Sequence, residues 1–356
     1  MKCRRFPPFE ANVVETNPRR LRSPARGIVG GPQPWLHRPP QFFLRLRAIL
    51  VVGLLAGLGG CNGASGPSGA ATSGNDTEPA KLRVLVTTGM IADIAQAVVG
   101  DDGSVVALMG PGVDPHLYQP TTRDQRRLRE ADLVLYNGLH LEGKMVEVFE
   151  ALAREKTVVA VTAGMPPDRL LAGSGGGGQH DPHVWFDVTL WQLATAAVVE
   201  ACAGVAPAQA DAFRTRGTVY LEQLAELDQY CRSRVAEVPE TRRVLVTSHD
   251  AFHYFGQAYG FEVVGIQGIS TESEAGLRRL TECVDLIRSR QVPAIFPESS
   301  VSRAAVERVA RDSGAKLGKE LYSDALGAAG GPAGSYRGMI RHNIDAIVDA
   351  LGEAAP

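Results

Sequence analysis

The residues of this 356-residue sequence best suited to chemistry are two copies of an Asp-Pro-His triplet. They stand at Asp114–His116 and at Asp181–His183. Proline fixes its own φ and keeps the preceding residue out of the helical region, so each histidine leaves a stiff, extended segment. A side chain held in this way can point at one fixed spot, as a metal ligand must. We therefore interpret both histidines as metal ligands.

Two further candidates come from the second half of the chain. His249 follows the β-rich run 244–247, and Asp324 follows a short run at 316–321. The predicted metal ligands are thus His116, His183, His249 and Asp324. Three imidazoles and one carboxylate match the four-coordinate, closed sites that Zn²⁺ prefers. Bidentate binding by Asp324 would expand the coordination and admit Mn²⁺, an ion that favours oxygen.

Other histidines have less support. A single histidine near the end of a strand is more often a hydrogen-bonded loop residue than a ligand, and this reading applies to His140. His342 lies within the last predicted helix and is interpreted as a surface residue. His253 follows His249 by four residues, so the two could share a helical face. No Glu follows His249 directly, which excludes the His-Glu-x-x-His motif of zinc proteases.

Two carboxylates could support the ligands without binding the ion. Asp250 directly follows His249, and Glu298 ends the predicted strand 294–296. Each could orient a ligand from behind. Glu298 could instead be a carboxylate at the start of the helix predicted for 302–312.

The elements that must position these side chains alternate between strands and helices. Strands are predicted at 82–87, 105–109, 133–136 and 158–161, and again at 244–247, 262–266, 294–296 and 316–321, with helical patterns between them. Such alternation favours parallel sheets covered by helices. Between the two sets, residues 208–238 form one proline-free helical pattern, about 45 Å long at 1.5 Å per residue. We predict an α/β fold of two parallel-sheet lobes joined by a single long rigid helix.

The first eighty residues look like a targeting region. Residues 1–60 hold ten Lys and Arg against two Asp and Glu, and an eleven-residue apolar run covers 48–58. A run of this length suits a signal peptide, since a membrane span takes about 20 residues. Leu58-Gly59-Gly60-Cys61 resembles a bacterial lipobox, in which Cys61 is lipidated and becomes the mature N-terminus. The segment before residue 40 is longer than a signal needs, so the true start codon could lie downstream.

These patterns divide the chain into five regions: a signal and lipobox region at 1–60, a flexible tether at 61–80, an N-terminal lobe at 81–206, a connecting helix at 207–239 and a C-terminal lobe at 240–356.

Charge and cysteine content exclude some function classes. Residues after 60 hold 27 basic and 37 acidic side chains, an excess that repels nucleic acid and attracts cations. Cys-x-x-Cys pairs are missing from the sequence, so a thiolate zinc site is not indicated. The glycine run Gly175–Gly178 carries one histidine at its end, His180, which does not support a metal-collecting loop.

Four motifs together resemble the zinc/manganese substrate-binding lipoproteins of ABC transporters, the cluster A-I metal-binding family. They are Asp114–Thr121, Asp181–Asp187, Ser248–Phe252 and Ser323–Gly327, and they follow the family's order and spacing. The resemblance covers roughly residues 81–351. It implies the same four ligands and two α/β lobes bridged by one helix. Manganese-selective members often have Glu as the third ligand, where this chain has His249.

The resemblance also implies a function. The protein would capture Zn²⁺, or alternatively Mn²⁺, outside the cytoplasmic membrane and deliver it to an ABC permease driven by its ATPase. It would be exported, anchored through a lipid on Cys61, and monomeric, without nucleic-acid partners. A site with four protein ligands leaves no position for an activated water, so an enzyme is not expected. Two other classes remain open: a surface adhesin on the same scaffold, and a zinc hydrolase.

Overall fold

A computed structural model describes residues 81–173 and 179–352, which belong to the compact unit Gly74–Pro356. The predicted signal region, the lipobox cysteine Cys61, the tether and the run Gly175–Gly178 lie outside the described residues.

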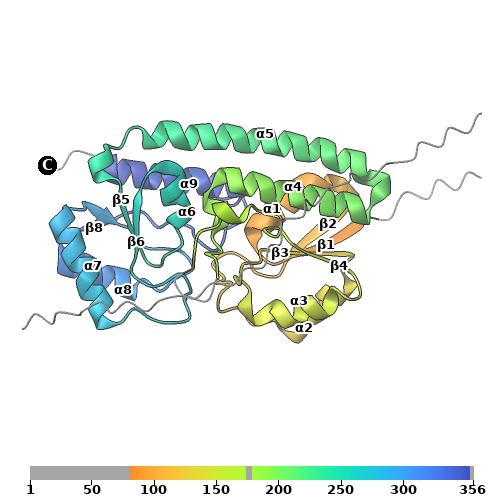
Figure 1. The fold of residues 1–356 in the computed structure, drawn as a ribbon, viewed down its shortest axis with the longest axis horizontal. Coiled ribbons are helices and arrows are strands. Elements are labelled where there is room, and N and C mark those ends of the chain that lie inside the picture. Colours follow the sequence, from red (N-terminus) through yellow and green to blue (C-terminus); the bar gives the residue numbers. More distant parts are fainter. Residues whose placement is uncertain (1–80, 174–178, 353–356) are drawn as a thin grey trace, which may run out of the picture. The chain divides into compact units, whose positions relative to one another are not determined.

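The N-terminal lobe contains one four-stranded parallel sheet in the order β2-β1-β3-β4 (Figure 1). Its strands are β1 (Leu82–Val86), β2 (Gly103–Ala107), β3 (Leu133–Tyr136) and β4 (Thr157–Ala160). Leu82 pairs with Gly103, and Leu133 pairs with Thr157. Strand β1 is buried at four of its five positions because helices cover both faces of the sheet.

The helices of this lobe include two that begin at side-chain caps. The helices are α1 (Gly89–Val99), α2 (Thr122–Glu130), α3 (Val146–Leu152) and α4 (Val188–Val205). Thr121 and Asp124 form a reciprocal capping box at the start of α2. Asp187 caps α4 by accepting hydrogen bonds from the backbone N–H groups of Thr189, at 2.8 Å, and Leu190.

The C-terminal lobe repeats the pattern with shorter strands. They are β5 (Val244–Thr247), β6 (Glu262–Gly265), β7 (Ala294–Ile295) and β8 (Lys316–Leu317). Strand β5 pairs with β6 and β7 pairs with β8, all parallel, and a bridge between Thr247 and Phe296 joins the two pairs. The helices are α6 (His253–Tyr259), α7 (Leu277–Arg290), α8 (Ala304–Ser313) and α9 (Tyr336–Gly352).

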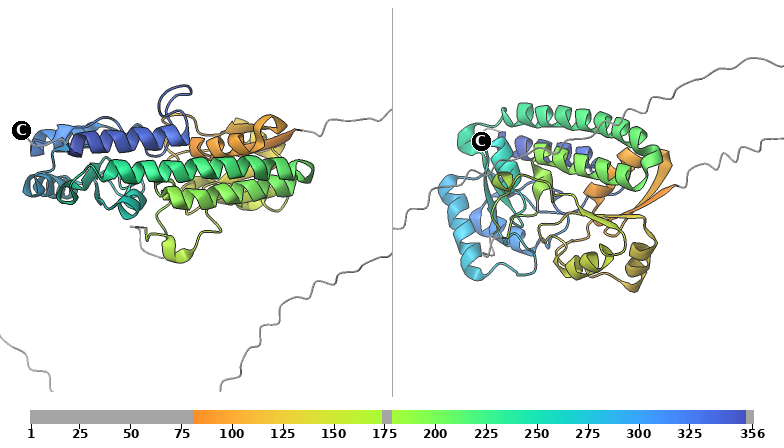
Figure 2. Two further views of the ribbon diagram at one scale, coloured as in Figure 1. Left: turned by 90° about the horizontal axis from the view of Figure 1, so that it is seen from above. Right: turned by 45° about the vertical axis from the view of Figure 1, so that its right-hand side comes forward.

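The long helix α5 (Ala210–Val235) runs along both lobes (Figures 1 and 2). It packs against α1 and α4 of the first lobe and against α6 and α9 of the second. Its 26 residues span about 39 Å, and 3₁₀ turns at Pro207–Gln209 and Glu240–Arg242 flank it. The predicted architecture of two parallel-sheet lobes joined by one long helix is confirmed.

Polar contacts fix α5 to both lobes. Near its start, Arg216 donates to the carbonyl oxygens of Val98 and Val99 at the end of α1. Near its end, Arg234 donates to Asp345 of α9 at 2.8 Å. Each end of the helix is therefore held by a different lobe.

Helices α4 and α5 approach closely at Gly217. A Cβ atom added there would lie 2.4 Å from Cγ2 of Val199, so glycine is required by the contact. Among the described residues, α4 alone is long and apolar enough to span a membrane, and half of that span is buried inside the protein. Burial of this kind is what a core helix shows.

Candidate metal centre

His116 lies in the loop after β2, at the carboxyl end of the first sheet. Its backbone N–H donates to Oδ1 of Asp114 at 2.8 Å, so the first residue of the triplet fixes the backbone of the third. The other oxygen of Asp114 accepts a hydrogen bond from Thr271, 2.5 Å away in the second lobe. The loop that carries His116 is therefore tied to the opposite lobe.

His183 belongs to the second triplet and is fully buried. Here the aspartate does more, because Oδ1 of Asp181 lies 2.9 Å from the backbone nitrogen of His183 and 2.7 Å from its ring Nδ1. A ring that donates Nδ1–H to a carboxylate presents Nε2 as a lone-pair donor. The 3₁₀ turn Val184–Phe186 and helix α4 follow directly.

His249 follows β5 and is equally buried. Glu298, which follows β7, accepts from the backbone N–H of His249 at 2.8 Å and lies 2.5 Å from its Nδ1. The carboxylate therefore fixes the orientation of this ring and leaves its Nε2 facing the site.

Asp324 comes from the loop after β8 and is 1% exposed. The preceding residue, Ser323, is held by the first lobe, since its carbonyl oxygen accepts a hydrogen bond from Nε1 of Trp185 at 2.9 Å. The hydroxyl of Ser300 lies 3.4 Å from Oδ2 of Asp324. The carboxylate thus reaches the boundary between the lobes.

The four side chains meet at one point. One ligand atom from each of His116, His183, His249 and Asp324 lies within 4.8 Å of all the others. Nε2 of His116 lies 3.2 Å from Nε2 of His183, and the Asp324 oxygens lie 3.4 Å and 3.3 Å from Nε2 of His183 and His249. Four ligands about 2.0–2.1 Å from a tetrahedral zinc ion lie about 3.3–3.4 Å apart, so the spacing suits such an ion.

Two polar atoms at this point lack hydrogen-bond partners within the described part of the chain: Nε2 of His249 and Oδ1 of Asp324. Both are completely buried, where an unpartnered polar atom costs about 1–3 kcal/mol. A bound cation would satisfy both atoms at once.

The electrostatics of the four groups differ. Burial lowers the pKa of His116 to about 4. Burial also lowers the pKa of His183 and His249, but the carboxylates of Asp181 and Glu298 outweigh it, so the net shift is upward. Burial raises the pKa of Asp324, yet the neighbouring imidazoles hold it well below its usual range. The carboxylates behind His183 and His249 therefore favour the protonated form of these rings, and the burial of His116 favours its neutral form.

The two carboxylates that the sequence suggested as supports for the ligands, Glu298 and Asp250, have different contacts in the structure. Glu298 contacts His249 rather than a helix start, since α8 begins only at Ala304, and the helix-terminus reading is wrong. Asp250 accepts from the backbone N–H of Gly265 and pairs with His253 rather than with the ring of His249.

Sequence reasoning missed the part played by Asp181, whose signal was its position two residues before His183.

The three other histidines considered in the sequence analysis as less supported, all within the described residues, lie outside the cluster. His253 lies 3.1 Å from Asp250 and 3.7 Å from Asp181. His342 bonds to the carbonyl oxygen of Glu320. His140 lies in an exposed turn.

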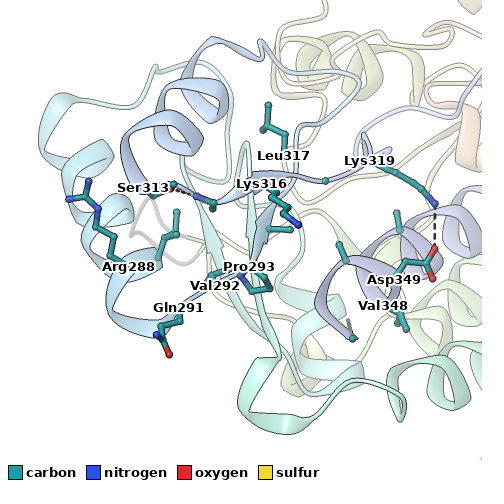
Figure 3. A pocket seen from close by; sticks show the side chains of 18 of the residues that line it. Arg288, Gln291, Val292, Pro293, Ser313, Lys316, Leu317, Lys319, Val348 and Asp349 are labelled. Carbon is teal, nitrogen blue, oxygen red and sulfur yellow. Dashed lines mark hydrogen bonds and ion pairs between the residues drawn. The ribbon is translucent and has the colours of Figure 1, made fainter. Parts of the chain in front are cut away.

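A groove of about 1080 Å³, separate from the four-residue cluster, lies in the C-terminal lobe between β8 and the ends of α7 and α9 (Figure 3). Arg288, Lys316 and Lys319 line it together with the carboxylates Glu237 and Asp349. Lys319 lies 3.4 Å from Asp349. This lining has no excess of negative charge, and none of the four predicted ligands contributes to it, so the groove is not the metal centre.

Comparisons with known proteins agree with the geometry. Residues 84–350 match the family described as Zinc-uptake complex component A periplasmic (ZnuA). The manganese-binding lipoprotein MntA of Bacillus subtilis (strain 168) is 46% identical over 276 residues, which cover 76% of this chain and 90% of that relative. The zinc-binding protein TroA of Treponema pallidum (strain Nichols) is 46% identical over 308 residues, which cover 85% and 96%.

Among solved structures, periplasmic zinc-binding TroA from Treponema pallidum matches with a TM-score of 0.75 at 47% identity. The match covers 77% of this chain and all of that one. The resemblance seen in the sequence is confirmed.

Proposed function

Because this chain belongs to the family of Zinc-uptake complex component A periplasmic proteins, we propose that His116, His183, His249 and Asp324 bind its cargo ion. Proteins of this family capture a divalent transition metal outside the cytoplasmic membrane and serve an ABC importer. The observation that carries the proposal is the meeting of four buried ligand atoms, two from each lobe, within 4.8 Å.

The donor set favours zinc. Three nitrogens and one oxygen at tetrahedral spacing suit Zn²⁺, whereas Mn²⁺ prefers more oxygen ligands. Both oxygens of Asp324 face the cluster, one toward His183 and one toward His249, so bidentate binding of Mn²⁺ is the alternative. The two relatives named above differ in the same way, since MntA is named for manganese and TroA for zinc.

The partners follow from the family, which works with an ABC permease and its ATPase. For this chain we propose a monomer anchored by a lipid on Cys61, which would keep the carrier beside its permease. We also propose that it has no catalytic activity, because four protein ligands complete a tetrahedral zinc site and leave no coordination position for water.

The deciding experiment is metal analysis of protein purified without added metal, followed by competition titration with Zn²⁺ and Mn²⁺. We expect one ion per chain, with Zn²⁺ displacing Mn²⁺. Asp324→Ala should strongly weaken the binding of both ions. His342→Gln changes a histidine outside the cluster and should leave both affinities unchanged. Equal binding by Asp324→Ala and by the unchanged protein would refute the site. Preference for Mn²⁺ would refute only the choice of ion.

A further inference from the structure

The loop between β6 and α7 contacts ligand-bearing segments of both lobes. Residues 267–272 of this loop, here called the strap, are bonded to the segment of His249 in their own lobe and to the loop of His116 in the other. The strap therefore connects two of the proposed ligands by a route that does not pass through the long helix α5.

We propose that Thr271, in the strap, is a positioning residue that holds His116 at the cluster and thereby sets how fast the ion leaves. This inference rests on the proposed function, because Thr271 can act on release only if His116 binds the ion.

At one end the strap holds the backbone on both sides of His249. The backbone N–H of Gln267 donates to the carbonyl oxygen of Ser248 at 2.9 Å, and the carbonyl oxygen of Gly268 accepts from the N–H of Asp250 at 3.3 Å. Ser248 and Asp250 are the two neighbours of His249 in the sequence. The strap and this ligand therefore form one structural unit.

At the other end the strap reaches His116 through a single carboxylate. The hydroxyl of Thr271 donates to Oδ2 of Asp114 at 2.5 Å, and Oδ1 of Asp114 accepts from the backbone N–H of His116 at 2.8 Å. Each oxygen of Asp114 therefore serves a different lobe. Hydrogen bonds to an ionised carboxylate are roughly twice as strong as those between neutral groups, so this link resists separation of the lobes.

His116 is the ligand that depends most on such a link. His183 and His249 are each oriented by a carboxylate at ring Nδ1, whereas the His116 ring has no carboxylate partner among the described residues. Its place in the cluster is thus set mainly through its backbone. His116 is also the most exposed of the four, at 7%, so its departure would open the site to water.

A second contact between the strap and the first lobe is weaker. Glu272 lies 3.5 Å from Lys144, and both side chains are exposed, so solvent screens this ion pair. Thr271 is half-buried and its acceptor is partly buried, so its hydrogen bond is screened less. Thr271 is therefore the residue through which the strap acts on His116.

The test measures Zn²⁺ release from the full-length chain in stopped-flow mixing with excess chelator. Trp185 supplies the signal, since its ring lies 5.2 Å from that of His183. Thr271→Val keeps the shape of the side chain and removes the donor, so we expect release to quicken about tenfold or more, with association changed less than about twofold. Thr271→Ser retains the hydroxyl and should restore the rate. Ser273→Ala, at an exposed position of the same loop, should leave it unchanged.

A double-mutant cycle tests the route through Asp114. Asp114→Ala should itself quicken release, and adding Thr271→Val to it should change the rate by less than about twofold, because the acceptor is already gone. Thr271→Ala, which also lacks the donor, repeats both measurements without the added methyl group, and circular dichroism confirms that each variant is folded.

Unchanged release from folded Thr271→Val and Thr271→Ala would overturn the proposal, as would a full effect of either in the Asp114→Ala background. Failure of the unchanged protein to bind Zn²⁺, or equal binding by Asp324→Ala, would instead overturn the four-residue site itself.

Discussion

Replacement of Glu298 by glutamine tests how the cluster is organised, because this carboxylate contacts His249 and is not one of the four proposed ligands. Its two oxygens accept from two donors of His249, the backbone N–H at 2.8 Å and ring Nδ1 at 2.5 Å. Glutamine offers one oxygen and one NH₂ group, so one of the two positions becomes a donor facing a donor. If the ring answers by adopting the other tautomer, its Nε2 carries the hydrogen and cannot bind an ion.

The magnitude follows from burial. Glu298 is 1% exposed and His249 is fully buried, so a hydrogen bond lost here costs about 1–3 kcal/mol. Removal of a partner that orients a metal-binding histidine typically lowers affinity 10–100-fold, or about 1.4–2.7 kcal/mol. We therefore expect Glu298→Gln to weaken Zn²⁺ binding about 10–100-fold in competition titration with a chelator of known affinity.

A matched control lies in the next residue after His249. Asp250→Asn removes an equally charged group whose contacts are with Gly265 and His253. It should change Zn²⁺ affinity by less than about threefold, since these contacts are with Gly265 and His253 rather than with the proposed ligands. The reasoning fails if Glu298→Gln binds Zn²⁺ as the unchanged protein does, or if Asp250→Asn weakens binding equally.

Three further outcomes are expected. The pKa values of His183 and His249 are raised, so protons compete with the ion for these rings. Zn²⁺ affinity should therefore fall with decreasing pH, beginning above the ordinary histidine pKa of about 6.5. Calorimetric titration between pH 8.5 and 5 checks this, and equal affinities across the range would contradict it. Hydrogen bonds to two carboxylates raise the pKa of His253 to about 10, so the stability it adds is complete below about pH 6.5 and lost as pH rises through about 10. The destabilisation caused by His253→Gln in urea unfolding should therefore shrink between pH 6 and pH 10. Gly217→Ala should destabilise the protein by about 1–3 kcal/mol by forcing α4 from α5, whereas Gly204→Ala, with open space at its Cβ, should be neutral or slightly stabilising in the same urea assay.

Local patterns predicted two strands, β3 and β5, to the residue and the others less closely. Strand β3 was expected at 133–136 and lies there, because an apolar run stands between polar residues. Helix α2 starts at Thr122, because Thr121 and Asp124 supply the cap. Helix α6 was not predicted, since its seven residues are too few for a periodic pattern and include Gly256.

The site was less accessible to local patterns. The two Asp-Pro-His triplets are identical in sequence, yet Asp181 orients a histidine ring, whereas Asp114 holds a backbone group and reaches Thr271 in the other lobe. Packing around each loop determines this difference, so the residues next to each triplet in the sequence do not predict it. Residue types and loop positions made His116 and Asp324 candidate ligands, and the family resemblance supported their meeting in one site.

The anchoring of α5 has a consequence for unloading. Arg216 and Arg234 fasten the helix to different lobes, so drawing the lobes apart means bending a continuous 26-residue rod or breaking those attachments. A binding protein with a flexible hinge can release its bound ion when thermal motion separates the lobes. We therefore expect the free protein to release its ion slowly. Separation of the lobes would then require energy from interaction with an ABC importer.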